Sequence, residues 1–72
     1  MKEFEKMTRK ELCVELYKYY LLEGTKPIGS TKPLKLVEFV RRYMNGIGSA
    51  RGFKKNELIG LLERKIERWG EL

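Results

Sequence analysis

Two glycine-containing stretches without apolar periodicity interrupt the chain, at residues 24–32 and 45–52. Outside them, apolar residues recur at intervals of three and four, which is the spacing of one face of an α-helix. Glycine, proline and asparagine at the interruptions favour turns over continued helix. The chain is therefore predicted to form three helices, over about residues 9–22, 33–45 and 54–69.

The first predicted helix has clear boundary signals. Thr8 is followed three residues later by Glu11, which is the pattern of a capping box, and Gly24 stands just after the last periodic residue. Met7 can pack against the first turn. Two apolar rows recur at helical spacing; they are Leu12, Leu16, Tyr20 and Cys13, Tyr17, Leu21. We expect Tyr17 and Tyr20 to face the core and Tyr19 to carry the exposed ring.

The second and third helices are predicted from similar signals. Thr31 before Pro33 is expected to cap the second helix, whose buried stripe should be Leu36, Val37, Val40, Tyr43 and Met44. The third helix should end at Gly70, with Phe53 as an apolar plug before it and Trp69 as a core or helix-end anchor. Its apolar face is predicted to be Leu58, Ile59, Leu62, Ile66 and Trp69.

A chain of 72 residues can close only one hydrophobic core. Its 42% hydrophobic content is sufficient for a globular fold. We therefore expect one all-α, three-helix domain over residues 1–72, with a glycine-rich loop between the last two helices. Residues 1–8 would be a lead-in, 24–32 a linker loop and 34–63 a helix-loop-helix module.

The cellular setting is inferred from features that the sequence lacks. The single cysteine, Cys13, cannot form an intramolecular disulfide, which favours a reducing compartment. No apolar run approaches the roughly 20 residues that cross a bilayer, and residues 1–6 alternate charged and apolar side chains. The prediction is an intracellular protein, in the cytoplasm or the nucleoid or nucleus, without a membrane.

Catalytic chemistry has few candidate residues. The chain contains no histidine and no aspartate, so nucleophilic triads and Cys/His metal sites are excluded. Its glutamates alternate with Lys or Arg, as solvated helix faces do. The glycine-rich stretch lacks the Walker spacing and a preceding strand. We therefore expect no enzyme activity, no catalytic residue, no metal and no cofactor.

Positive charge is concentrated in the middle of the chain. Residues 1–23 hold five Lys or Arg against five Glu, and residues 57–72 hold three against four. Residues 24–56 hold eight Lys or Arg against Glu38 alone, a local net charge of +7. This central basic segment favours a polyanionic partner.

The segment from Leu34 to Glu63 resembles the helix-extended-loop-helix modules, the SAP, LEM and Rho-N-terminal group of small domains. Gly46 and Ile47 match a Gly-Leu pair, Gly52 matches a loop glycine, and Lys55, Leu58 and Ile59 match a Lys-x-x-Leu-Ile stretch. The spacing from Gly52 to Lys55 is one residue longer than usual, and the loop is richer in glycine. The resemblance implies DNA binding for a SAP-like module, RNA binding for a Rho-like one and a protein partner for a LEM-like one.

The predicted function is binding of the nucleic-acid backbone, with DNA favoured over RNA. Glycines at a helix start can expose amides to a phosphate, and nearby cations add charge. The candidate contacts are the side chains of Lys32, Lys35, Arg41, Arg42, Arg51, Lys54 and Lys55, with the loop backbone at Gly46, Gly48 and Gly52.

The alternative prediction is a small interaction module that docks on a larger protein machine, with its basic middle against an acidic surface. Arg41 and Arg42 could also serve only to stabilise the end of their own helix. A membrane-surface helix is disfavoured because the positive charges are spread across loops. The sequence does not fix the oligomeric state.

Overall fold

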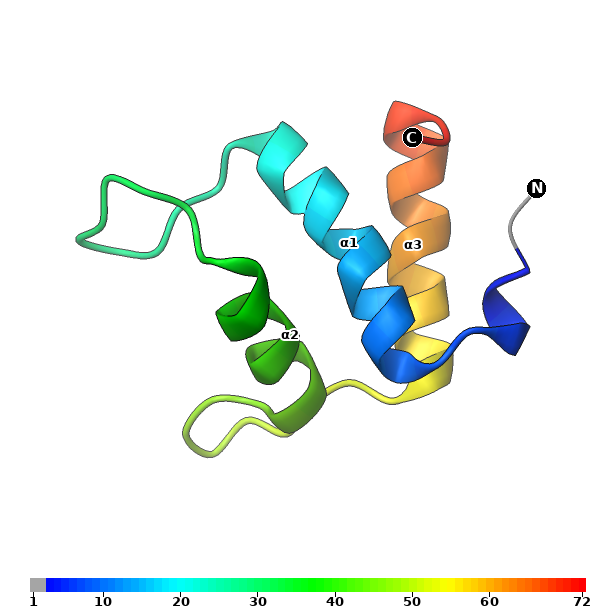
Figure 1. The fold of residues 1–72 in the computed structure, drawn as a ribbon, viewed down its shortest axis with the longest axis horizontal. Helices are drawn as coiled ribbons and strands as arrows, with labels where there is room; N and C mark the ends of the chain where they lie inside the picture. Colours follow the sequence, from blue (N-terminus) through cyan, green and yellow to red (C-terminus); the bar gives the residue numbers. More distant parts are fainter. Residues whose placement is uncertain (1–2) are drawn as a thin grey trace.

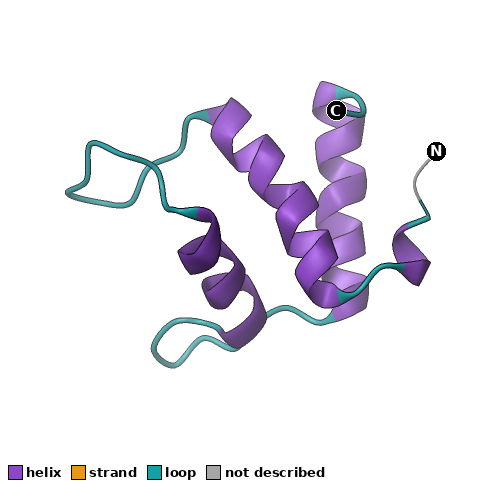
Figure 2. Cartoon of the chain, in the orientation of Figure 1, coloured by secondary structure: helices purple, strands orange, loops and turns teal. Residues whose placement is uncertain are grey.

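The computed structural model describes residues 3–72, and within them the chain forms three α-helices and no strand (Figures 1 and 2). The helices are α1 (Arg9–Glu23), α2 (Leu36–Asn45) and α3 (Lys55–Trp69), preceded by one 3-10 turn, η1 (Phe4–Lys6). The predicted all-α, three-helix class is confirmed. None of these helices combines the length and apolarity that a bilayer span requires.

The boundaries of α1 follow from local hydrogen bonds. The Glu11 amide donates to Thr8 Oγ1 at 3.1 Å, and the Thr8 amide donates to Glu11 Oε1 at 2.9 Å, so the capping box is formed. At the other end Gly24 adopts the left-handed conformation, with φ of 71°. Its amide donates to the Leu21 carbonyl at 3.2 Å. Both predicted boundary signals are confirmed, and the helix is one residue longer than expected.

The core forms around α1, which packs against both α2 and α3. Within the described chain its buried side chains are Leu12, Cys13, Leu16 and Tyr19 from α1, Phe39 from α2, and Leu58 and Leu62 from α3. Because α1 has a neighbour on two sides, it is apolar on more than one face.

The prediction that Tyr19 carries the exposed ring is wrong. Its side chain is only 4% exposed, and its hydroxyl donates to the Gly70 carbonyl at 2.9 Å. Leu12, Leu16 and Tyr19 have the spacing i, i+4, i+7, which forms one helical face as well as the row that was predicted. This contact joins α1 to the end of α3. Leu21, the last residue of the second apolar row, is 48% exposed.

The second helix begins later than predicted, at Leu36, and Thr31 does not cap it. Two tyrosine hydroxyls of α1 hold the peptide groups of Leu34: the Tyr17 hydroxyl donates to the Leu34 carbonyl at 2.7 Å, and the Leu34 amide donates to the Tyr20 hydroxyl at 2.8 Å. These bonds occupy backbone groups of Leu34 before α2 begins. Lys35, the residue before α2, has an extended backbone, so the helix begins only at Leu36.

The buried face of α2 also differs from the predicted stripe. Leu36 and Val37 are 40% and 68% exposed, while Phe39, which was not in the stripe, is buried. The Phe39 ring lies 4.2 Å from the Tyr43 ring and within 5.2 Å of Tyr17 and Tyr20, measured between centroids. This aromatic cluster turns α2 so that Leu36 and Val37 face solvent.

The third helix matches its prediction and ends before Gly70. Leu58 and Leu62 are buried, and Ile59, Ile66 and Phe53 pack partly against the core. Trp69 is 40% exposed, and its indole nitrogen donates to Glu23 Oε2 at 3.3 Å. Trp69 is therefore an anchor at the helix end and not a core residue.

Candidate nucleic-acid interface

The loop between α2 and α3 folds back on itself through short-range hydrogen bonds. The Gly46 amide donates to the Arg42 carbonyl at 2.8 Å, and Ile47 and Ala50 exchange N–H···O bonds of 3.1 and 2.9 Å. Gly48 has a φ of 58° and makes the tight reversal possible. The Phe53 amide then donates to the Tyr43 carbonyl at 2.7 Å, which fastens the end of the loop to α2.

Two glycines of this loop are required by close packing. A Cβ atom on Gly46 would overlap the Ala50 carbonyl oxygen, and one on Gly52 would overlap the Met44 carbonyl oxygen. The backbone therefore passes itself at distances that no side chain permits. This crossing accounts for Gly46 and Gly52, two of the three loop glycines that were predicted to offer backbone contacts to a phosphate.

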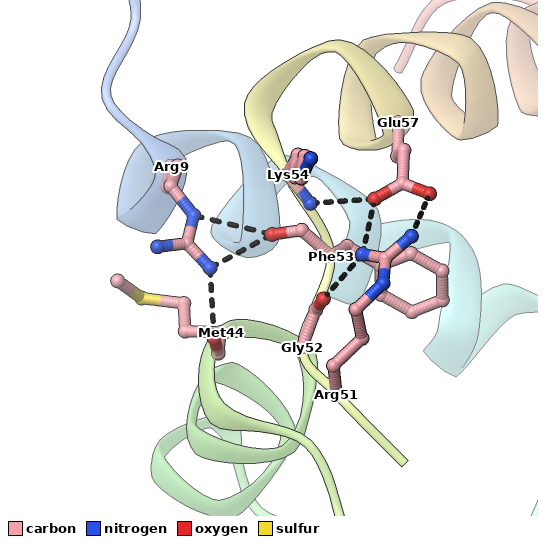
Figure 3. Close-up of polar contacts among 7 residues, drawn as sticks. All are labelled: Arg9, Met44, Arg51, Gly52, Phe53, Lys54 and Glu57. Carbon is pink, nitrogen blue, oxygen red and sulfur yellow. Dashed lines mark hydrogen bonds and ion pairs between the residues drawn. The ribbon is translucent and has the colours of Figure 1, made fainter.

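Arg9 is a structural residue that the sequence analysis missed. Its Nη2 donates to the Met44 carbonyl at 2.7 Å and to the Phe53 carbonyl at 2.8 Å, and its Nε donates to Phe53 at 3.2 Å (Figure 3). Arg9 thus joins the start of α1 to both sides of the loop. The only signal in the sequence is a cation in the first turn of a helix, where the dipole disfavours one.

Glu57 occupies the start of α3, where a phosphate was predicted. Arg51 donates from Nη1 and Nη2 to the two Glu57 carboxylate oxygens, at 2.7 and 2.9 Å (Figure 3). The Lys54 amide also donates to Glu57 Oε1, at 2.8 Å. The Arg51 guanidinium, together with this amide, lowers the pKa of the Glu57 carboxyl from its ordinary 4.5 to about 2.

We expect Glu57→Gln to reduce the acid sensitivity of folding. Because the pKa of Glu57 is lower in the folded chain, its stabilising effect is full above about pH 4.5 and is lost as pH falls toward about 2. Urea unfolding at several pH values in that window should show a steeper decline for the wild type than for the variant. Glu63→Gln, which removes an exposed carboxylate, is the control. An equal decline in wild type and Glu57→Gln would contradict the assignment.

Two of the seven predicted cations are engaged by the protein itself. Arg51 forms an ion pair with Glu57. The ammonium of the half-buried Lys55 donates a hydrogen bond to the Glu5 carbonyl, and this bond joins η1 to α3. The other five have exposed side chains that make no hydrogen bond or ion pair within residues 3–72; they are Lys32, Lys35, Arg41, Arg42 and Lys54. Of these, Lys54 also attracts the nearby Glu57 carboxylate and so contributes to lowering its pKa.

The free cations lie along α2 and beyond both of its ends. Lys32 and Lys35 precede α2, and Lys54 follows the loop at its other end. Arg41 and Arg42 are on the helix but face different sides, because successive residues differ by about 100° around the axis. Arg42 lines a pocket together with Arg51, whereas Arg41 lines a groove together with Lys10. The structure therefore brings the predicted residues together only in part.

Two hollows border this basic region. The first is a pocket of about 390 Å³ between α1, α2 and the loop, with Leu16, Phe39 and Phe53 in its wall. The second is a groove of about 460 Å³ between α1 and α2, lined mainly by apolar side chains: Val14, Leu36, Val37, Val40 and Met44. Neither hollow was predicted, because each depends on how the helices are placed.

Chemically reactive groups are few in the described residues. Cys13 is fully buried, and burial raises the pKa of its thiol, which opposes formation of a nucleophilic thiolate. In residues 3–72 no three His, Cys, Asp or Glu side chains are grouped so that they could hold a metal ion.

Comparison with known proteins gave no assignment: no protein-family model, no curated protein and no solved structure matches the chain.

Proposed function

We propose that this chain binds the sugar-phosphate backbone of nucleic acid, through charge and shape, and that it is not an enzyme and needs no cofactor. One observation carries the proposal. Six of the eight Lys and Arg residues in segment 24–56 have exposed side chains that make no hydrogen bond or ion pair within residues 3–72. They are Lys26, Lys32, Lys35, Arg41, Arg42 and Lys54.

Positive side chains without a negative partner repel one another, which raises the free energy of the unbound protein. They are therefore available to a polyanion. Each phosphate that they neutralise releases condensed counterions, so that log K falls with log salt at about −0.9 per contact on duplex DNA. Contacts of this kind fix position without reading sequence. The proposal therefore predicts strong salt dependence and little base preference.

The loop backbone has a smaller part in the proposed contact than its glycines suggested. The backbone amide of Gly46 already donates to the Arg42 carbonyl, and the amides of Ile47, Ala50 and Phe53 donate to other backbone carbonyls. The amide of Gly48, at the tip of the turn, has no protein acceptor within residues 3–72 and remains available to a phosphate. DNA is placed before RNA on the SAP-like resemblance of residues 34–63, and an intracellular location belongs to the same proposal.

We expect the double variant Lys32→Ala/Lys35→Ala to weaken DNA binding and to reduce the slope of log K against log salt by about 2, since about one counterion is released per contact. Fluorescence anisotropy with a labelled duplex checks this. The matched control is Arg64→Ala/Arg68→Ala, which removes the same charge from exposed positions of α3. If both double variants reduce the slope equally, overall charge and not this region determines binding.

The apolar groove favours a second candidate, docking on another protein. Val37 is 68% exposed on α2, Leu36 is 40% exposed, and both line the groove beside Val14. A protein interface depends on a few buried anchors, whereas backbone binding depends on many similar cations. Val37→Asn, which removes the apolar side chain without adding a charge, should therefore abolish protein docking while leaving the salt slope of DNA binding unchanged. Loss of DNA binding in Val37→Asn would exclude this separation of the two surfaces.

A further inference from the structure

The pocket beside α2 has an apolar wall and a cationic rim. Its volume of about 390 Å³ lies in the range of small-ligand sites. Side chains from four parts of the chain form it: Leu16 from α1, Leu34 before α2, Phe39 from α2, and Ile47 from the loop. Ile47 is 56% exposed, so the apolar wall continues to the surface.

The charges at the rim favour an anionic occupant. The pocket is lined by three cationic side chains, Arg42, Arg51 and Lys65, and by one carboxylate, that of Glu23. Lys65 is paired with Glu23 at 2.7 Å and Arg51 with Glu57, whereas Arg42 is exposed and has no ion pair within residues 3–72. Arg42 is therefore the rim cation available to a ligand, and it also belongs to the proposed backbone contact.

The pocket also offers polar groups that a purely aliphatic ligand would leave unsatisfied. The Tyr43 hydroxyl makes no hydrogen bond within the described residues, although the Tyr20 hydroxyl accepts one from the Leu34 amide. Burial, and then the nearby Glu23 carboxylate, raises the pKa of Tyr43, so its hydroxyl stays a donor at neutral pH. Thr25 adds an exposed hydroxyl at the mouth.

A nucleobase with its phosphate is complementary to the apolar wall, the cationic rim and the polar groups of the pocket. It is flat and largely apolar on its faces, it carries donors and acceptors on its edge, and it is attached to a phosphate. Within a duplex, the base is stacked and paired, so only single-stranded nucleic acid can present it without an unstacking cost. Charge at the entrance and an apolar site for the base are the usual combination in single-strand binding.

We propose that this pocket accepts one unpaired base of single-stranded DNA, with the adjoining phosphate on Arg42. The base lies against the apolar wall, and its edge meets the Tyr43 and Thr25 hydroxyls. This inference rests on the proposed backbone binding and adds the part of the nucleotide that the backbone contact does not read.

The test compares two labelled oligonucleotides of about 12 residues, the site-size range of single-strand binders. One is oligothymidylate, and the other has the same backbone with stable abasic residues. Thr25→Leu places a larger, non-aromatic side chain at the pocket mouth and removes the hydroxyl, without a change of charge. Thr31→Leu makes the same change in the same loop, away from the pocket, and is the matched control. Circular dichroism establishes that both variants are folded.

The expected result is that oligothymidylate binds about tenfold or more tightly than the abasic strand at about 50 mM salt, a ratio typical of one stacked base. The ratio should fall to near one in Thr25→Leu and stay unchanged in Thr31→Leu. Equal binding of both strands by the wild type would overturn the base pocket and leave the backbone proposal standing. A ratio that survives in Thr25→Leu would place the base elsewhere. No binding of either strand would overturn the base pocket, and the backbone proposal would then be decided by duplex DNA and RNA.

Discussion

Phe39→Ala is expected to lower the free energy of unfolding by about 3–5 kcal/mol, the cost of deleting a buried aromatic side chain. Phe39 is the buried side chain of α2, at 2% exposure, and its ring contacts those of Tyr17, Tyr20 and Tyr43. Removing it leaves a cavity where α2 meets α1. Because a small domain is stable by only about 5–15 kcal/mol, the loss is a large share of the total.

Urea unfolding followed by circular dichroism measures this effect. Phe39→Leu keeps most of the volume and should cost less, about 1–2 kcal/mol, which keeps the test informative if the alanine variant does not fold. Val37→Ala is the control on the exposed side of the same helix and should change stability by no more than about 0.5 kcal/mol. Equal effects for Phe39→Ala and Val37→Ala would contradict the burial of Phe39 against α1.

Gly52→Ala is expected to destabilise the fold by about 3 kcal/mol, at the upper end of overpacking effects, because the clash is with backbone. The added Cβ would overlap the Met44 carbonyl oxygen at the end of α2. The loop would have to move away, which would strain the hydrogen bond from Phe53 to Tyr43 and the Arg9 bonds to Met44 and Phe53.

The matched control is Gly60→Ala, within α3, where nothing lies within 4 Å of an added Cβ. Alanine in a helix interior is favoured over glycine by about 0.5–1 kcal/mol, so this variant should be stabilised. Thermal or urea unfolding of both variants should therefore give shifts of opposite sign. A stabilised Gly52→Ala would contradict the close crossing of the loop and α2.

The parts of the fold that local chemistry determines were predictable from the sequence. The capping box at Thr8 and the glycines at positions 24 and 70 mark helix ends through contacts within a few residues. The start of α2 was not predictable, because it depends on hydroxyl groups of Tyr17 and Tyr20, 14 to 17 positions away from Leu34. The buried face of α2 likewise depends on which rings meet Phe39.

The candidate site shows the same division. The excess of positive charge in residues 24–56 can be counted directly from the sequence. The sequence does not show which of these cations remain free, because that depends on tertiary contacts. Lys55 donates to the carbonyl of Glu5, 50 positions away, and Arg51 at the end of the loop pairs with Glu57 of α3. The same long-range arrangement gives Arg9 its role and forms the pocket beside Arg42.

We propose that the free cations around α2 bind a polyanion. Fluorescence anisotropy of the wild-type chain with labelled duplex DNA, single-stranded DNA and RNA, at about 50 and 200 mM salt, tests this proposal. For about five phosphate contacts, we expect affinity for DNA to fall on the order of 10²- to 10³-fold across this range. No binding of any of the three at the lower salt would contradict the claim and leave protein docking at the Val37 groove as the surviving function.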